Sequence, residues 1–577
     1  MGTKKTREHA LTGIDGARSP ASIPRRSPDL ILHNGSIVTV DASFTTASAV
    51  AVSGGIITAV GSDGDILATA GPATQVIDLA GKTVLPGIND AHLHGVNLGL
   101  TYPPHCVPLA FPEVQTIADV VARVEQAAKS TPPGQWIFGR GWDTAYLREC
   151  VETNREPSRH DLDAVSPDHP VYLQDFSGHA AWVNTLALKA ANVDSTTVPR
   201  VGGVIEHDAA GHPTGILREA AQVLVRDARP APDSRQLAQA VRTALERLRS
   251  IGITSYTEPG LDAASIATYS ALLESGELTS RVTVLFLPTG QASESDRFKR
   301  ALDGWNKTSE TDPRKLKLAG VKIFADGIPP NRTAWMHEPY VDGGCGSLCV
   351  PGDTDSEREA ELAEIIRYAH DAGHQIGVHV TGDRGIDAVV DSFAAAQREN
   401  PQTDPRHYVI HGDFLGARSM KILAEHGFGV NMNPTIKWTI AEAEEAVVGS
   451  ERAGYEWPYR DALDAGLPVT SGSDAPVTTP DWRQGIATML LREGKASGRV
   501  SGPEQRITLA EAIRTYTINP AWQDFAEDWK GSIEVGKVAD FCILDGDILK
   551  THPRDIPGLN VVCTVLDGEI VYEAADQ

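Results

Sequence analysis

Apolar and polar positions follow two different rhythms along the chain. Near both ends, short apolar runs lie between glycine-rich turns, a texture typical of strands joined by hairpins. The N-terminal runs are Leu30–His33, Ser36–Val40, Ala49–Val52 and Ile56–Val60, and the C-terminal runs are 536–544 and 563–572. Neither end has enough strands to bury both faces of a sheet. We therefore expect residues 29–83 and 530–577 to form one composite β-sandwich.

Between the two ends, strand-like apolar runs alternate with amphipathic helical patterns. The strand-like runs begin at residues 252, 282, 318, 375, 408, 429 and 467. The helical patterns include 234–250, 356–372, 385–399 and 509–518. With the run that starts at Val84, they make about eight β/α units. This rhythm predicts an α/β chain with a (β/α)₈ TIM barrel over 84–104 and 231–529.

Residues 105–230 interrupt the alternation after the first barrel strand. They are rich in Trp, Pro, Gly and turn signals. We expect an inserted α+β domain near the barrel mouth that caps the substrate, because loops there normally shape the pocket. Residues 1–28 are polar and broken by Ser, Pro and basic residues, which predicts a disordered tail. No apolar segment follows Arg25 and Arg26 as an export signal requires.

Composition narrows the classes of partner. The formal net charge of −24 disfavours nucleic acid and an anionic membrane as partners, since both attract basic surfaces. No apolar run approaches the roughly 20 residues that span a bilayer. Six scattered cysteines indicate reduced thiols and a cytoplasmic location rather than a disulfide framework. A small-molecule substrate is the partner that remains.

The first candidate chemistry is the His-x-His pair His92 and His94, which follows the apolar run Val84-Leu85. In a strand, side chains at i and i+2 project to the same face. The two imidazoles would then stand close enough to share one metal ion. A chance pair on an exposed strand face is the alternative that these two residues alone leave open.

Further polar residues end or interrupt later apolar strands: Lys322, His379, His411 and Asp474. A lone buried histidine is usually a hydrogen-bonded core residue. Several such residues at the same end of successive barrel strands instead indicate an active site, because that end carries it in barrel enzymes. Imidazoles and a carboxylate suit Zn²⁺, with Mn²⁺, Fe²⁺ or Co²⁺ as replacements.

Lys322 needs a separate explanation, because an ammonium group cannot bind a cation and is costly to bury unpaired. A lysine deprotonated by burial can react with CO₂ to give a carbamate, whose two oxygens could bridge two metal ions. The alternative is a salt bridge from Lys322 to Asp326 or Asp474.

These motifs together resemble the amidohydrolase superfamily, and in particular its YtcJ-like branch, which includes N-substituted formamide deformylases. The matching segments are VLPGINDAHLH at 84–94, GHAAWVN at 178–184, VKIFADG at 321–327, HVTGDRGID at 379–387, SGSDAP at 471–476 and GSIEVGKVADF at 531–541. The resemblance covers roughly residues 29–573. It is specific for the superfamily and unspecific for the substrate.

The resemblance implies roles by position. His92 and His94 would bind a first metal ion with Asp474 nearby, and a carbamate on Lys322 would bridge to a second ion. His379 and His411 would hold that second ion, although one ion or two stays open. The branch commonly has an acidic residue where this chain has Ile410, so the surroundings of His411 are expected to differ. The resemblance also leaves a homodimer or a larger homo-oligomer open.

The expected reaction is hydrolysis of an amide-type C–N bond in a small, largely uncharged N-substituted amide or formamide. A metal-bound hydroxide would attack, and Asp474 would act as general base. The same centre could instead open an ester, lactone, cyclic imide or carbamate. A non-catalytic binding or regulatory protein would usually lack ligands, and all six positions are filled here.

Candidate substrate contacts are weaker predictions. Trp142, Trp182, Trp335 and Trp438 would favour apolar groups if they line the pocket, and ordinary core packing is the alternative. His179 and His207 would hold a substrate carbonyl or oxyanion, or serve as structural hydrogen-bonding residues. Arg332 would meet a substrate carboxylate, or form a surface salt bridge.

Overall fold

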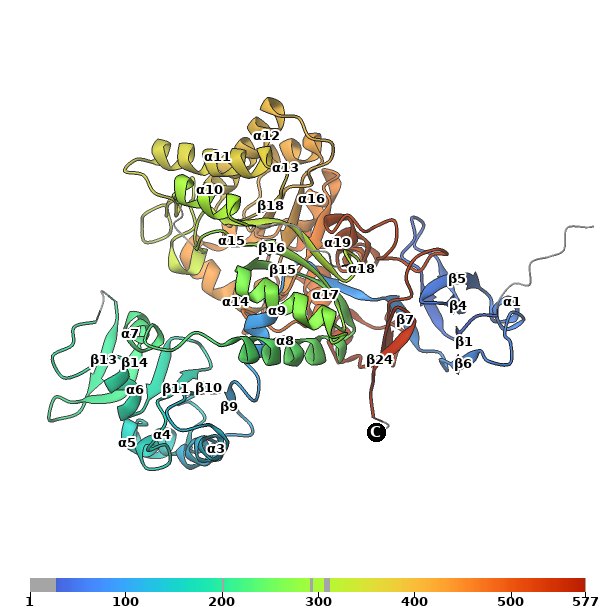
Figure 1. Ribbon diagram of the computed structural model, residues 1–577. Helices are drawn as coiled ribbons and strands as arrows, with labels where there is room; N and C mark the ends of the chain where they lie inside the picture. Colours follow the sequence, from blue (N-terminus) through green and yellow to red (C-terminus); the bar gives the residue numbers. More distant parts are fainter. Residues whose placement is uncertain (1–26, 200–201, 291–293, 306–311, 576–577) are drawn as a thin grey trace, which may run out of the picture.

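A computed structural model describes residues 27–199, 202–290, 294–305 and 312–575. The predicted tail lies outside the described residues, apart from Ser27 and Pro28. Figure 1 shows three regions in space: a central barrel, a β-rich region made by the two ends of the chain, and a separate region formed by residues that follow the first barrel strand.

Eight parallel strands form the central sheet and confirm the predicted (β/α)₈ barrel. In spatial order they are β8 (Ile88–Asp90), β15 (Ile253–Leu261), β16 (Arg281–Phe286), β17 (Leu316–Phe324), β18 (Gln375–Val380), β19 (Tyr408–His411), β20 (Gly429–Met432) and β21 (Val469–Ser471). The first and last strands are joined just past their ends. The Ala91 N–H donates to the Ser471 carbonyl at 3.1 Å, and the Asp474 N–H donates to the His92 carbonyl at 2.8 Å.

Helices cover the outside of the barrel: α8 (Ser234–Arg249), α9 (Ala263–Glu274), α11 (Asp355–Asp371), α12 (Asp383–Glu399), α13 (Ala417–His426), α14 (Pro434–Val448) and α17 (Trp482–Leu491). The helix α8 shows why such segments form. Asp233 caps its first turn in a reciprocal pair with Gln236, and the i, i+3 and i+7 positions Val241, Ala244 and Leu248 are buried.

The single helix expected over 509–518 is wrong. The structure has two short helices, α18 (Leu509–Thr515) and α19 (Ile518–Gln523), separated by Tyr516 and Thr517 in non-helical conformations. Pro520 explains the break, because proline has no N–H to donate and is tolerated only in the first turn of a helix.

Both ends of the chain contribute to one sheet. Its order is β24 (Glu569–Glu573), β23 (Val561–Leu566), β22 (Phe541–Leu544), β7 (Thr83–Pro86), β2 (Ser36–Val38) and β3 (Thr46–Ala47). A second sheet contains β5 (Ile56–Gly61), β4 (Ala49–Ser53), β1 (Leu30–His33) and β6 (Gln75–Asp78). Side chains from both sheets, including Leu32, Val50, Val84 and Phe541, share one buried core. We refer to the two sheets together as the terminal sheets.

The chain passes from the terminal sheets to the barrel through a single residue, Gly87. Val84 and Leu85, expected to begin the first barrel strand, instead lie in β7 and pair with Ile543 and Cys542 of β22. The barrel strand begins later, at Ile88. A Cβ atom at Gly87 would lie 2.1 Å from the Thr254 hydroxyl oxygen, so only glycine fits this crossing.

The region that follows the first barrel strand has its own sheet and its own cores. The sheet order is β13 (Val204–His207), β14 (Pro213–Arg218), β12 (Ala180–Val183), β11 (Val171–Asp175), β10 (Ile137–Trp142) and β9 (Val107–Pro108). Helix α3 (Ile117–Ser130) packs beside it, and Figure 1 places the whole region to one side of the barrel, beyond α8. Across the described residues, no helix is long and apolar enough to cross a lipid bilayer.

Candidate metal centre and cavity

The six predicted polar residues meet at the carboxyl ends of the barrel strands. Lys322 lies in β17, His379 and His411 lie near or at the ends of β18 and β19, and Asp474 follows β21 by three residues. Together with His92 and His94 they line one cavity of about 280 Å³. We call these six residues the ligand cluster.

His92 and His94 reach the cavity differently from the prediction. They lie in the turn after β8 rather than within a strand, and His94 precedes the helix α2 (Gly95–Leu100). Their ring centroids are 5.3 Å apart and the ring planes are perpendicular. The turn packs tightly on the end of β21, because a Cβ at Gly472 would lie 2.7 Å from the His92 backbone nitrogen.

The closest potential ligand atoms belong to His92, His411 and Asp474, and they all lie within 4.8 Å of one another. Asp474 Oδ1 is 3.3 Å from the Nε2 atoms of both His92 and His94. The His379 ring lies 4.6 Å from the His411 ring, centroid to centroid. The cluster is therefore compact enough for its donors to share metal ions.

The protonation states suit metal binding. Burial, helped by the nearby Lys322 charge, lowers the pKa of His92 to about 3 and that of His379 to about 4. Burial also holds the pKa of His411 well below its ordinary value. Burial opposes ionisation of Asp474, but hydrogen bonds from His92 and His94 keep its pKa well below the usual range. Neutral imidazoles and an ionised carboxylate are the forms that bind divalent cations.

An unpartnered nitrogen atom of His92 and the backbone conformations of two other residues also agree with a metal site. The Nδ1 atom of His92 is buried and has no hydrogen-bond partner in the part of the chain that the structure describes. His411 and Asp474 adopt left-handed backbone conformations, with φ of 77° and 54°. For residues other than glycine, such a conformation costs about 1–3 kcal/mol and is typical of functional sites.

Asn433 orients His411 and was missed from the sequence. His411 Nδ1 lies 2.7 Å from Asn433 Oδ1 and donates to it, which leaves Nε2 with a free lone pair. The Asn433 amide also donates to the Gly472 carbonyl at 2.9 Å. Asn433 comes directly after β20, so the strand-end rule that identified the other residues would have found it.

Two buried carboxyl groups hold the turns of the ligand cluster and were also missed. Asp90, at the end of β8, accepts the N–H groups of Ser473 at 3.0 Å and His92 at 3.2 Å, and burial raises its pKa to about 7. Glu258, in β15, accepts the N–H of Gly95 and the Tyr269 hydroxyl. They tie the His92 turn to neighbouring strands.

Lys322 is buried and its ammonium is uncompensated. In the described ranges its Nζ makes no hydrogen bond or salt bridge, so the alternative ion pair with Asp326 or Asp474 is not formed. Asp326 is committed elsewhere, since it accepts N–H groups of Trp335, Thr381 and Gly382. Burial lowers the pKa of Lys322 to about 7, so a large share of this amine is neutral at neutral pH.

The rest of the cavity wall is mainly apolar. It is formed by Phe324, Ile328, Pro329, Pro330, Ile436, Ile440 and Val477. Three further lining residues, Asp413, Glu444 and Trp457, carry buried polar atoms, and we call them the acid cluster. They come from the loop after β19, from α14, and from the segment between α15 (Ser450–Tyr455) and α16 (Tyr459–Asp464).

Comparison with known proteins settles the family. The model of the family described as "Amidohydrolase family" matches residues 75–572. The chain belongs to the amidohydrolase family. The membership confirms the resemblance and the predicted enzyme class, a hydrolase of carbon–nitrogen bonds.

Individual relatives of this amidohydrolase span nearly its whole length. The N-substituted formamide deformylase of Arthrobacter pascens is 29% identical over 551 residues, which cover 94% of this chain and 98% of that protein. The putative amidohydrolase YtcJ of Bacillus subtilis is 28% identical over 94% of this chain and 99% of its own. An uncharacterised metal-dependent hydrolase from Pyrococcus furiosus is 26% identical, with a TM-score of 0.71 over 90% of this chain and 100% of that chain.

The structure does not bring the predicted substrate contacts of the inserted region to the cavity of the amidohydrolase. Trp142 is buried in that region's own core, where its indole N–H donates to the Leu173 carbonyl at 2.9 Å. Its ring packs edge-on against Trp182. His179 is exposed and pairs with Glu219, and His207 is exposed at the end of β13.

The remaining predicted contacts also lie outside the cavity wall. Arg332 is exposed and donates to Asp342 at 2.7 Å. Trp438 lines a different hollow, where Lys495 lies over its ring. Trp335 is buried beneath Arg384. The aromatic residues that do line the cavity are Phe324 and Trp457.

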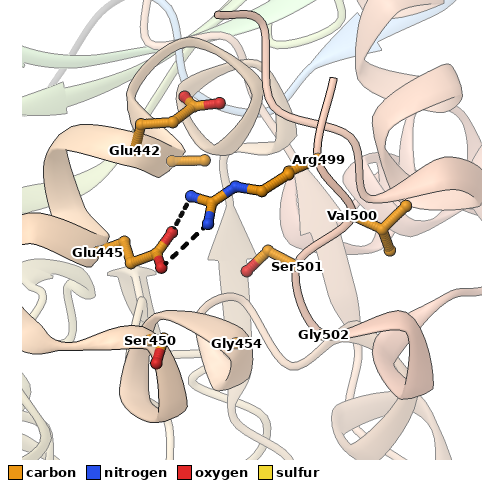
Figure 2. Close-up of a pocket in the computed structure, with 9 residues that line it drawn as sticks. Glu442, Glu445, Ser450, Gly454, Arg499, Val500, Ser501 and Gly502 are labelled. Carbon is orange, nitrogen blue, oxygen red and sulfur yellow. Dashed lines mark hydrogen bonds and ion pairs between the residues drawn. The ribbon is translucent and has the colours of Figure 1, made fainter. Parts of the chain in front are cut away.

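A separate polar groove lies beside α14 and contains no predicted site residue. Figure 2 shows Glu442 and Glu445 along α14, with Arg499 reaching toward Glu445. Arg499 makes two hydrogen bonds with that carboxylate, so its charge is already compensated. The groove is a solvated face of the amidohydrolase with no free cation for an anionic ligand among its lining residues.

Proposed function

We propose that this amidohydrolase uses bound metal to hydrolyse the amide bond of a small N-substituted amide or formamide. The observation that carries the proposal is the ligand cluster: neutral imidazoles gathered around an ionised, buried carboxylate at the wall of a mainly apolar cavity. The A. pascens relative, whose name states an action on N-substituted formamides, supports the substrate class.

The metal site would use the donors in the arrangement that the family resemblance implies. His92 and His94 would hold one ion with Asp474, and His379 and His411 would hold a second with a carbamate on Lys322. The donor set suits Zn²⁺, with Mn²⁺, Fe²⁺ or Co²⁺ as replacements. When bound, such an ion lowers the pKa of water and polarises a carbonyl group.

Asp474 would carry the proton in the reaction. Its carboxylate is ionised and lies against the donor atoms of the ligand cluster, where it can accept a proton from the attacking water. The water oxygen bonds to the acyl carbon, the C–N bond breaks, and Asp474 passes the proton to the departing nitrogen. The products are a carboxylic acid, or formic acid, and an amine.

Lys322 would enter as a carbamate. Its neutral Nζ attacks CO₂, an N–C bond forms and one proton is released, so the neutral amine becomes an anion. The change would remove the uncompensated charge that the cavity otherwise carries at Lys322. The two carbamate oxygens would then be available as metal ligands beside His379 and His411.

The decisive experiment replaces Asp474 by Asn in the metal-loaded enzyme, with N-butylformamide as substrate. We expect turnover to fall about a thousandfold, the scale of a lost general base, while elemental analysis finds metal content close to wild type. Asp391→Asn, an exposed change on α12, is the matched control and should leave turnover unchanged.

Near-normal turnover in Asp474→Asn would remove Asp474 from this role. A wild-type enzyme that hydrolyses the matched butyl formate but leaves N-butylformamide intact would move the assignment from amide to ester hydrolysis.

A further inference from the structure

The acid cluster leaves several buried polar atoms without donors or acceptors. Glu444 is fully buried, and no N–H or O–H donor of the described chain reaches either of its carboxyl oxygens. Asp413 Oδ1 and the indole N–H of Trp457 are likewise buried without a partner. All three residues line the same cavity as the ligand cluster. Buried polar groups are normally hydrogen-bonded, so this concentration needs an explanation.

The neighbouring cations, Lys437 and Arg492, do not hydrogen-bond to these unpartnered atoms. Lys437 donates to the Glu456 carboxylate at 3.0 Å, to the Ala453 carbonyl at 2.8 Å and to the Ser501 hydroxyl at 3.3 Å, which uses its three N–H groups. Arg492 donates to the backbone carbonyls of Ser501, Trp457, Gly454 and Glu456. Neither cation donates to Glu444.

Three buried carboxyl groups, Glu444, Glu456 and Asp413, lie beside these two cations, whose N–H groups are committed to other acceptors. The carboxyls of Glu444 and Glu456 contact each other, so one of them holds a proton when no further cation is present. Burial, with the charges of Glu456 and Asp413, raises the pKa of Glu444 well above its ordinary value. A cation placed in the cavity would replace that proton and supply donors to the unpartnered oxygens.

We propose that the acid cluster receives a protonated amino group carried by the N-substituent of the substrate, which makes Glu444 a specificity-determining residue. The inference rests on the proposed function and sharpens it, since the expectation of a largely uncharged substrate then holds only for the part along the apolar wall. Carboxylates give an ammonium group its charge and acceptors, and the indole ring of Trp457 adds a cation–π surface.

The test compares two formamides of equal length in the metal-loaded enzyme, N-(3-aminopropyl)formamide and N-butylformamide. We expect kcat/KM to favour the aminopropyl compound by about tenfold or more, the scale of one charge-assisted hydrogen bond. Glu444→Gln should abolish the preference, because the amide has no negative charge to pair with the ammonium group.

Glu442→Gln is the matched control. Glu442 lies on the same helix, two residues away, but lines the outer groove of Figure 2, where it accepts from Ser497. It should keep the full preference. A wild-type enzyme without the preference, or a preference that survives Glu444→Gln, would overturn the inference while leaving amide hydrolysis intact.

Failure of the proposed function is a separate outcome. If neither formamide is hydrolysed, calorimetric titration of the metal-loaded protein with butylammonium chloride decides the inference. Binding to wild type that Glu444→Gln loses, and Glu442→Gln keeps, supports it. Absence of binding to wild type, or equal binding to the Glu444→Gln variant, contradicts it.

Discussion

The ligand cluster and the acid cluster are two sets of buried polar groups on the wall of one cavity, and they are completed in different ways. In the ligand cluster, donors and acceptors face one another, as Asp474 does with His92 and His94. Within the described chain, Glu444 and Asp413 of the acid cluster keep unpartnered oxygens although Lys437 lies close by. The ligand cluster pairs its carboxylate with its own imidazoles, whereas the acid cluster, on our proposal, is completed by the ligand.

Their origins in the fold differ as well. Ligand-cluster residues lie in barrel strands or just after them, where a rigid parallel sheet fixes their positions. The acid cluster comes from a loop, a helix and a segment between helices. Strand ends hold a site in a fixed position, and the surrounding helices and loops can change the substrate without disturbing it.

After Asp474→Asn, the next largest effect is expected at Lys322, the member of the ligand cluster whose Nζ makes no hydrogen bond or salt bridge with the described residues. We expect Lys322→Gln to lower turnover about a hundredfold, because the variant cannot form a carbamate to hold and orient metal. After equilibration with ¹³C-bicarbonate, a carbamate signal should appear in the NMR spectrum of wild type and be missing from the variant. Lys421→Gln, at an exposed lysine, is the control. A fully active wild-type enzyme without the signal would disprove the modification.

A smaller effect is expected on the pH dependence of stability, which should distinguish the acid cluster from a buried network whose groups are all paired. Because the pKa of Glu444 is raised in the folded state, the folded protein holds this proton after the unfolded chain has lost it. The stability that this group contributes is complete below its ordinary pKa of 4.5 and declines as the pH rises toward the folded pKa. The variant Glu444→Gln lacks the decline, so its stability relative to wild type should improve between pH 5 and pH 8.

Urea unfolding at the two pH values measures this difference, and Glu442→Gln provides a control of opposite sign. Hydrogen bonding with Ser497 lowers the pKa of Glu442, so wild type gains stability from it above its ordinary pKa and loses that stability on acidification. The Glu442→Gln variant should therefore lose slightly, relative to wild type, as the pH rises. Parallel trends in the two variants would show that Glu444 is not a strained buried acid.

The smallest expected effect concerns a residue that belongs to neither cluster. Arg332→Ala should change kcat/KM less than about twofold and leave stability close to that of wild type, because Arg332 forms an exposed surface ion pair with Asp342. Steady-state kinetics and thermal unfolding check both values. A tenfold loss of kcat/KM confined to substrates that carry a carboxylate would show that Arg332 does contact the substrate.

The ligand cluster could be predicted from the sequence because its polar residues stand out against apolar strands. His379, His411 and Asp474 each follow an apolar run, and the common end of parallel strands brings them together. The same reasoning misplaced His92 and His94 in a strand, since the pairing of Val84 and Leu85 with β22 depends on residues far along the chain.

The acid cluster could not be predicted from the sequence, because its residues do not stand out in the same way. Glu444 shares a helix face with Ala441 and Val448, but a single carboxyl in an apolar stripe does not reveal whether a lysine will neutralise it. Tryptophans pose the same problem: Trp142 and Trp457 look alike in sequence, and only tertiary packing assigns one to a core and the other to the cavity wall.

The position of β7 between β2 and β22 has a consequence for biosynthesis. Strand β7 ends at Pro86, whereas β22 begins at Phe541, so one edge of β7 stays without its neighbour until synthesis has reached β22. At ribosomal rates this interval lasts roughly 20 to 90 s. During that time the unpaired edge is open to aggregation or to chaperones. The nascent amidohydrolase thus completes its terminal sheets only after the strands of its barrel have been synthesised.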